Sequence, residues 1–311
     1  MGQVQFGLIV SENAREFPHR LHYLDTLDRL FTLVTGHFES AWCIDHLDGD
    51  VLEGWTHATY LAALHPQFTW GHTVLCQSFR NPALLAKMGA TLQFLSGGRF
   101  VLGLGAGGQA AEYRAYGYPF PRGSTRVAEL EEALQIIRAM WTQERVTVEG
   151  RHYRVDNARC EPRPHPIPPI VIGAFRPKML RLTARYADGW NVSSTGISEY
   201  RTLTEEFERA CAETGRDPGT VRRIWSGGCV CAPTEAEVAL LAASRQVLGE
   251  EYAYQVGEDL IGTPAQIIQQ MEPFIDLGVD SFLIDCGGFP RLTTVEMLVN
   301  EVLPVLKRAT Q

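Results

Sequence analysis

Short apolar runs alternate along this chain with longer segments in which apolar residues recur at helical spacing. The first run, VQFGLIVS at residues 4–11, has the length and the β-branched content of a buried strand. Residues 17–36 then place leucines, phenylalanine and valine three or four positions apart, which is the period of an amphipathic helix. The pattern therefore predicts a strand followed by a helix that covers it.

The same alternation continues through the first third of the chain. We predict strands at residues 39–46, 69–76 and 99–107, with helices at residues 55–64 and from Pro82 onward. Proline is favoured at the first helical position, so Asn81 is the predicted N-cap of the latter helix. The rhythm breaks at residues 108–168, where we predict a long helix at 126–141 and a hairpin at 145–155 that turns at Glu149–Gly150.

Four further strands are predicted after the break, at residues 169–175, 189–194, 222–232 and 280–288. Eight strand–helix units favour a TIM-like (β/α)8 barrel that forms one domain over residues 1–311, with an insertion at about 108–168. The alternative is a doubly wound open sheet. No GxGxxG opens a helix after the first strand, where such a sheet would carry it.

The composition of the chain limits which partners and which cellular compartment we expect. The 311 residues carry a net charge of −8, which argues against nucleic acid or an anionic membrane surface as a partner. The N-terminal residues show no basic region ahead of an apolar stretch, and the first apolar run reads as a strand and not as a signal peptide. Seven scattered cysteines without metal-ligand spacing indicate free buried thiols in a reducing compartment. We therefore expect a cytoplasmic protein with no metal site.

A parallel barrel places its active site at the C-terminal ends of its strands. Residues 11–12, 45–46, 73–76, 105–108, 174–176, 191–194 and 285–288 follow predicted strands and are the candidates. Asp45 and His46 are the most informative pair because two adjacent polar side chains end an apolar strand. Histidine is the commonest general acid or base near neutral pH. The alternative is that His46 merely caps a loop.

Two other stretches have features of a ligand site. The glycine-rich run GLGAG at residues 103–107 would let a flat ring approach the backbone, although tight strand–helix packing explains such runs equally well. The stretch GAFRPKMLR at residues 173–181 joins a strand to a helix with Pro177 in its first turn. Free N–H groups there, with Arg176 and Lys178, would favour an anion, although a solvated basic turn is the alternative. Arg80, Lys87 and Arg99 are interpreted as structural or solvated.

Five blocks stand out together between residues 39 and 195: SAWCIDH, GHTVLCQSFRNPALLAKMGATLQFLSGGRFVLGLGAGGQAAEYRAYGYPFP, RVAELEEALQIIRAMW, EGRHYRVDNARCEPRPHPIPPIVIGA and LRLTARYADGWN. In this order they resemble the luciferase-like monooxygenase superfamily, and most closely its deazaflavin-dependent oxidoreductase branch. The C-terminal third resembles the family more loosely, through IGTPAQIIQQMEPFIDLGVDSFLI.

The resemblance implies a TIM-like barrel, dimeric in most members, that binds coenzyme F420 or FMN. It implies that Asp45 and His46 lie at the tricyclic ring, with His46 as acid or base and Asp45 positioning the cofactor or tuning the site by hydrogen bonding. It also implies a non-proline cis peptide at Thr73–Val74 that forms a bulge behind the ring. By the same resemblance Gly105, Ala106 and Gly107 lie near the ring, and Ala174, Phe175 and Arg176 hold the phosphate.

The chain departs from the family pattern in two places. Sugar-phosphate dehydrogenases of the family carry a glutamate at the position of Gly108, so a different substrate is expected here. The phosphate turn reads Ala-Phe-Arg where glycines are common, so the charge of Arg176 would replace backbone contacts.

Three functions follow as hypotheses. The first is an F420-dependent oxidoreductase that moves a hydride to or from a small organic substrate. The second is an FMN-dependent monooxygenase, which would need oxygen and a flavin reductase partner. The third is a cofactor-binding barrel without turnover, motivated by the missing acid at Gly108. If His46 is not the proton donor, the expected alternative is water or another side chain such as Glu12 or Glu112.

Overall fold

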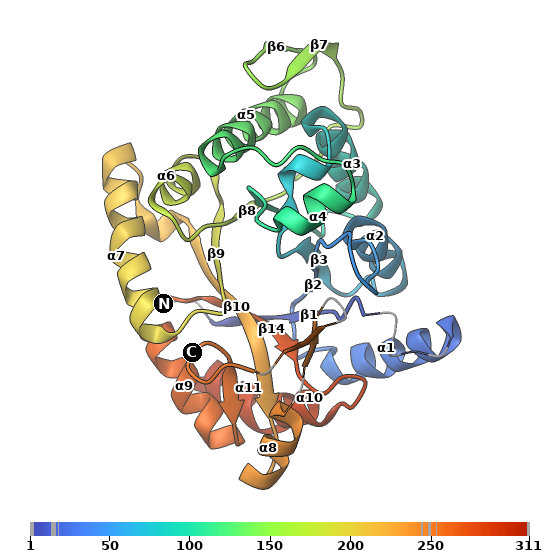
Figure 1. The fold of residues 1–311 in the computed structure, drawn as a ribbon, viewed down its shortest axis with the longest axis vertical. Coiled ribbons are helices and arrows are strands. Elements are labelled where there is room, and N and C mark those ends of the chain that lie inside the picture. The colour runs from blue at the N-terminus through green and yellow to red at the C-terminus, as the bar shows by residue number, and fades with distance from the viewer. Residues whose placement is uncertain are drawn as a thin grey trace.

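The computed structural model describes residues 3–13, 17, 19–243, 245–247, 250–252 and 254–309. Eight strand positions form a closed parallel barrel with helices around it (Figure 1). The barrel strands, in chain order, are β1 Gln5–Ile9, β2 Ser40–Cys43, β3 Thr69–His72 continued by β4 Leu75–Cys76, β5 Phe100–Gly105, β8 Ile170–Gly173, β9 Gly189–Ser193, β10 Arg222–Cys231 and β14 Ser281–Cys286. The barrel closes because β10 pairs with β9 on one side and with β14 on the other.

The strands follow one another around the barrel in chain order, and each neighbouring pair is parallel. The predicted (β/α)8 architecture is confirmed, and each of the eight predicted strands contains a barrel strand. The covering helices are α1 Arg20–Val34, α2 Gly54–Leu64, α3 Pro82–Leu95, α5 Gly123–Thr142, α6 Pro177–Tyr186, α7 Ile197–Thr214, α9 Pro264–Asp276 and the C-terminal run of α10 Thr293–Met297, η3 Leu298–Val302 and α11 Leu303–Ala309.

Several smaller helices and strands add to the barrel and its covering helices. After β5 the chain forms α4 Ala110–Ala115, then α5 and a hairpin of β6 Val146–Glu149 with β7 Arg154–Ala158. The other additions are η1 Gln77–Phe79, η2 Pro218–Thr220, α8 Glu235–Ala242, the pair β11 Arg245–Val247 and β12 Glu250–Tyr252, and β13 Leu260–Gly262. The predicted hairpin and long helix are both present, whereas α4 was not predicted.

Local sequence signals act as expected at the start of α3. The Asn81 side chain accepts hydrogen bonds from the backbone N–H groups of Ala83 (2.9 Å) and Leu84 (3.3 Å), and Pro82 occupies the first helical turn. Two donors that would lack a partner at the helix start are thereby satisfied. Asn81 is therefore the N-cap, as predicted.

The barrel interior is filled around Trp42. A Cβ atom on Gly7 would lie 2.7 Å from the indole nitrogen of Trp42, and one on Gly71 would lie 2.5 Å from its ring. Glycines on the two flanking strands thus make room for one large ring. Trp42 packs with Ile9, Val171, Ile224 and Leu283 into a cluster inside the barrel. This cluster separates the cavity described below from a smaller one of about 220 Å³ at the N-terminal ends of the strands.

All seven cysteines are free and buried, as predicted. In the part of the chain that the structure describes, no helix is both long and apolar enough to cross a bilayer.

Candidate active site

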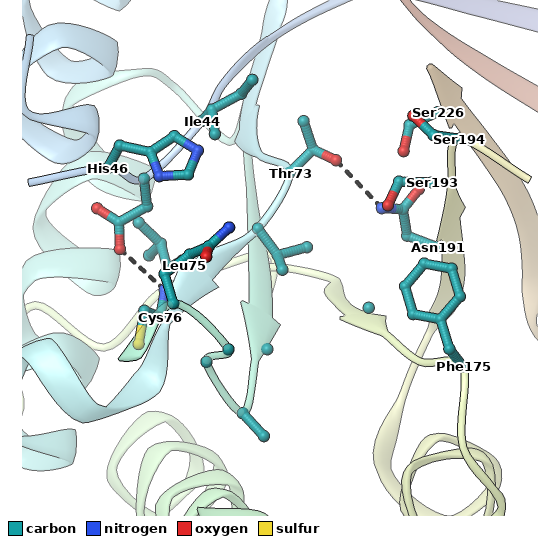
Figure 2. A pocket seen from close by; sticks show the side chains of 18 of the residues that line it. Ile44, His46, Thr73, Leu75, Cys76, Phe175, Asn191, Ser193, Ser194 and Ser226 are labelled. Carbon is teal, nitrogen blue, oxygen red and sulfur yellow. Dashed lines mark hydrogen bonds between the residues drawn. The ribbon is translucent and has the colours of Figure 1, made fainter. Parts of the chain in front are cut away.

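A cavity of about 570 Å³ opens at the C-terminal ends of the barrel strands. Figure 2 shows His46, Leu75 and Cys76 on one side of it, and Phe175, Asn191, Ser193, Ser194 and Ser226 on the other. Its lining comes from all eight strand positions and from α4 and α6, and consists of Ile9, Ile44, Asp45, His46, residues 73–76, residues 105–109, Glu112, Tyr113, Gly173, Phe175, Arg176, Met179, Asn191, Ser193, Ser194, Ser226, Gly227 and Asp285. The location is the one that the barrel topology predicts for an active site.

One wall of the cavity is a break in the third barrel strand. The peptide bond between Thr73 and Val74 is cis, at the position named from the sequence, and it separates β3 from β4. The Val74 side chain lies against glycines on the next strands. A Cβ on Gly105 would lie 2.8 Å from it, and one on Gly173 would lie 3.1 Å from it. Small residues on β5 and β8 therefore accommodate the Val74 side chain.

The glycine-rich run at residues 103–107 covers the end of β5 and the two residues after it. A side chain at Gly103 would collide with the His72 carbonyl oxygen, and one at Gly107 with the Tyr113 hydroxyl. Gly107 also has a φ of +74°, where residues with a side chain are strained. Tight packing, the alternative interpretation of this run, therefore accounts for Gly103, Gly105 and Gly107. Gly108 is different, because a Cβ there would meet no heavy atom within 4 Å.

Asp45 belongs to a buried ion pair. Its side chain has no exposed surface, and both of its oxygens accept hydrogen bonds from the Arg80 guanidinium, at 2.7 and 2.8 Å. One oxygen also accepts from the backbone N–H of Cys76 at 2.8 Å. Arg80 in turn contacts Glu53, which caps α2. Asp45 therefore ties β2 to the strand break, and it also belongs to the cavity lining, so a role at a bound molecule stays a prediction.

His46 lies at the cavity wall with its side chain 19% exposed. Its Nδ1 atom is buried and lies 3.6 Å from an oxygen of Glu112, which belongs to α4. Glu12, the other carboxylate considered from the sequence, does not line the cavity. The structure thus places the carboxylate of Glu112, on α4, close to His46, the candidate acid or base.

Two polar atoms on the far wall lack a partner within the described part of the chain. Asn191 donates from Nδ2 to the Thr73 hydroxyl at 3.1 Å, which orients its amide and leaves Oδ1 buried and unpaired (Figure 2). The hydroxyl oxygen of Ser226 is likewise buried and unpaired. Buried polar groups are nearly always hydrogen-bonded. These two atoms are therefore candidates for contact with a bound molecule.

The start of α6 forms the basic edge of the cavity. Arg176 is the N-cap of this ten-residue helix and lines the cavity together with Phe175. Ala174 does not line it: Ala174 is 1% exposed, and its N–H donates to the Asn191 carbonyl at 3.1 Å. Lys178 is exposed and also outside the lining. Of the predicted anion turn, the structure brings Phe175 and Arg176 to the cavity.

Burial shifts the pKa values of three neighbouring groups, Cys76, Tyr113 and His72, in the direction of their neutral forms. Cys76 and Tyr113 line the cavity with their sulfur and hydroxyl oxygen 3.1 Å apart, and burial raises the pKa of both above their usual values. Behind the strand break, fully buried His72 stacks on Trp55, and burial lowers its pKa to about 4. None of these three groups is charged at neutral pH.

Residues from β10 and α4 complete the site, and sequence reasoning missed several of them. Ser226 and Gly227 lie in the middle of β10, a ten-residue strand whose first half pairs with β9 and whose second half pairs with β13. The apolar sequence of β10 does not indicate that this strand changes its pairing partner from β9 to β13. Gln109 lies directly before α4, and Tyr113 lies within it. The six residues of this helix are too few to show a helical period.

Comparisons with known proteins agree with this architecture. The family described as luciferase-like monooxygenase matches residues 35–258. An F420-dependent glucose-6-phosphate dehydrogenase of Kineococcus radiotolerans is 33% identical over 300 residues, covering 86% of this chain and 89% of that protein. An F420-dependent hydroxymycolic acid dehydrogenase of Mycobacterium tuberculosis is 27% identical over 301 residues, covering 87% of this chain and 81% of that protein.

A solved structure has the same fold. It is an F420-dependent secondary alcohol dehydrogenase in complex with an F420-acetone adduct, with a TM-score of 0.84 and 20% sequence identity. The match covers 98% of this chain and 99% of that one.

Proposed function

The chain belongs to the luciferase-like monooxygenase family, and from that premise we propose that it is an oxidoreductase that transfers a hydride between coenzyme F420 and a small organic substrate. The observation that carries this proposal is the cavity at the strand ends, in a chain that is similar over most of its length to dehydrogenases named for F420. FMN is the alternative cofactor, and the names of these relatives favour F420.

The residues around the cavity fit such a cofactor. The cavity of about 570 Å³ and the open side of Gly108 leave room for a flat ring and a substrate. The unpaired Asn191 Oδ1 and Ser226 Oγ offer hydrogen bonds to a polar ligand. The first turn of α6 with Arg176 offers positive charge and free N–H groups to a phosphate. Val74 and Gly105 would lie against the ring.

In this proposal His46 exchanges the proton that accompanies the hydride. Bound F420 supplies the carbon that accepts or gives the hydride. An alcohol that loses a hydride must also lose its hydroxyl proton, and His46 is a partly exposed titratable side chain in the lining of the cavity. The Asp45–Arg80 pair holds β2 and the strand break in register, so its role is to support the wall next to His46.

Two competing functions predict different outcomes. An FMN-dependent monooxygenase would consume oxygen and would need a flavin reductase partner. A barrel that only binds its cofactor would hold F420 without turning it over.

The remaining features of the proposal concern assembly and location. We treat residues 1–311 as one barrel domain with the insertion at about 108–168. Exposed apolar side chains on α2 and α3 support a homodimer: Tyr60, Leu64, Leu84, Phe94 and Leu95 are 42–70% exposed. The seven free buried cysteines support a cytoplasmic location. The net charge of −8 supports small molecules, and not nucleic acid or membrane lipid, as ligands.

The test is turnover of the cofactor. Purified protein is incubated without oxygen with F420 and a panel of primary and secondary alcohols, and with reduced F420 and the matching aldehydes and ketones. Glucose 6-phosphate serves as the comparison substrate. The proposal expects the absorbance of F420 to change with at least one substrate. Binding of F420 without any turnover across the panel would support the binding barrel. In a separate incubation with reduced FMN and oxygen, oxygen-dependent turnover would support the monooxygenase.

A further inference from the structure

Glu112 is a buried carboxylate that connects α4 to the loop after β2. Its residue is 6% exposed, and one of its oxygens accepts the backbone N–H groups of Leu47 and Asp48. The hydroxyl of Tyr116, just after α4, donates to the carbonyl oxygen of Leu47. Two side chains of this segment therefore hold the residue that directly follows His46.

The same Glu112 oxygen faces the ring of His46. The distance from Nδ1 to Oε1 is 3.6 Å, slightly longer than a hydrogen bond. Nδ1 is buried and has no hydrogen-bond partner in the described part of the chain. Hydrogen bonds between catalytic groups are often long in a protein without its ligands and tighten in the complex. Glu112 is thus placed to act on His46 as well as on the loop.

We propose that Glu112 is a positioning residue that holds neutral His46 in the tautomer with its proton on Nδ1. A lone pair on Nδ1 would lie 3.6 Å from a carboxylate oxygen and be repelled by its charge, whereas an N–H there is attracted to it. The lone pair of the neutral ring then lies on Nε2, the nitrogen free to meet a substrate.

This inference rests on the proposed function, in which His46 exchanges the substrate proton. When an alcohol is oxidised, the O–H proton moves to Nε2 while the hydride leaves the carbinol carbon for the cofactor. The product is a carbonyl compound, and the imidazolium that forms lies beside the Glu112 carboxylate. In the reverse direction the same Nε2–H returns the proton to the oxygen of the carbonyl substrate. Glu112 thereby compensates for the carboxylate that is absent at Gly108.

The competing interpretation is that Glu112 only anchors the loop. Three variants separate the two roles. Glu112→Gln keeps an oxygen that can accept from the Leu47 and Asp48 amides and from Nδ1–H, but removes the charge. Glu112→Ala removes every contact. Tyr116→Phe is the matched control, because it removes a link from this segment to Leu47 without touching His46.

The deciding measurement is the tautomer of His46 in the protein without cofactor. Two-bond ¹H–¹⁵N correlation spectra of histidine-labelled protein identify which ring nitrogen carries the proton, and the signal lost in His46→Gln assigns the residue. We expect Nδ1–H in wild type, Glu112→Gln and Tyr116→Phe, and a shift towards Nε2–H in Glu112→Ala. A neutral wild-type ring with its proton on Nε2 would overturn the inference, even if Glu112→Ala failed to fold.

Kinetics provide the second readout. We expect turnover to fall about ten- to a hundred-fold in Glu112→Ala and less in Glu112→Gln, with F420 affinity within a few-fold of wild type and Tyr116→Phe nearly normal. Equal losses in Glu112→Ala and Tyr116→Phe would mean that anchoring the loop is the whole role of Glu112. Failure of wild type to consume F420 would refute the proposed function, and the tautomer measurement would still decide the role of Glu112.

Discussion

Replacing Gly107 by alanine should destabilise the fold strongly, because this position combines two separate penalties. Its φ of +74° lies in the left-handed region, which costs a residue with a side chain roughly 1–2 kcal/mol. The new Cβ would also collide with the Tyr113 hydroxyl and lie 2.7 Å from the Cys76 sulfur. Tyr113 is fully buried, so it must shift within a packed wall, and overpacking of this kind costs roughly 1–3 kcal/mol.

Together these costs predict a loss of roughly 2–5 kcal/mol in the free energy of unfolding of Gly107→Ala. Gly108→Ala is the matched control: the neighbouring glycine has ordinary φ, and its Cβ would meet nothing within 4 Å. A Gly→Ala change at such a position stabilises by about 0.4–1 kcal/mol through the unfolded chain. Urea unfolding followed by circular dichroism measures both. Equal stability of the two variants would refute the reasoning, as would a Gly107→Ala protein within about 1 kcal/mol of wild type.

Substitutions at three other residues test cofactor binding, catalysis and stability one at a time. Arg176→Ala should weaken F420 binding about ten- to a hundred-fold, the equivalent of roughly 1.5–3 kcal/mol, while exposed Lys178→Ala should not. Equal weakening for dephosphorylated F420 would mean that Arg176 does not contact the phosphate. His46→Ala should lower turnover about a hundred-fold at saturating cofactor with far less change in affinity; a large affinity loss with normal turnover would contradict the acid–base role. His72, whose buried ring has a pKa of about 4, gains a proton on unfolding between about pH 6.5 and 4, so acid favours the unfolded state. The contribution of His72 predicts a free energy of unfolding about 2 kcal/mol lower at pH 5 than at pH 7, and His72→Phe should remove this difference. The same pH dependence of stability in His72→Phe as in wild type would contradict the prediction.

The barrel could be predicted from the sequence because each strand is a short apolar run bounded by polar residues or glycine, and the helices between them keep a clear period. Asn81 with Pro82 marked the start of α3 for a local reason, namely that the cap satisfies N–H groups two and three residues away. Signals of this kind depend on neighbours along the chain, and the sequence contains them in full.

Contacts between distant residues were harder to predict. Arg80 pairs with Asp45, which lies 35 positions earlier in the chain, because η1 lies near the end of β2 in the fold. No local sequence pattern predicts this pair. Ser226 entered the cavity because β10 changes its pairing partner in mid-strand. Glu112 lies on a helix too short to show a period. The bond between Thr73 and Val74 was indicated by family resemblance alone.

The most direct test of the account is a fluorescence titration of purified, cofactor-free protein with F420 and, separately, with FMN. The account predicts saturable binding of F420 at one site per chain, with FMN bound at least ten-fold more weakly. Substitution of Asn191 by leucine should weaken F420 binding, because it removes the unpaired amide oxygen on the far wall of the cavity. FMN binding as tight as F420 binding, or no saturable binding of F420, would contradict the assignment of this cavity to the deazaflavin cofactor.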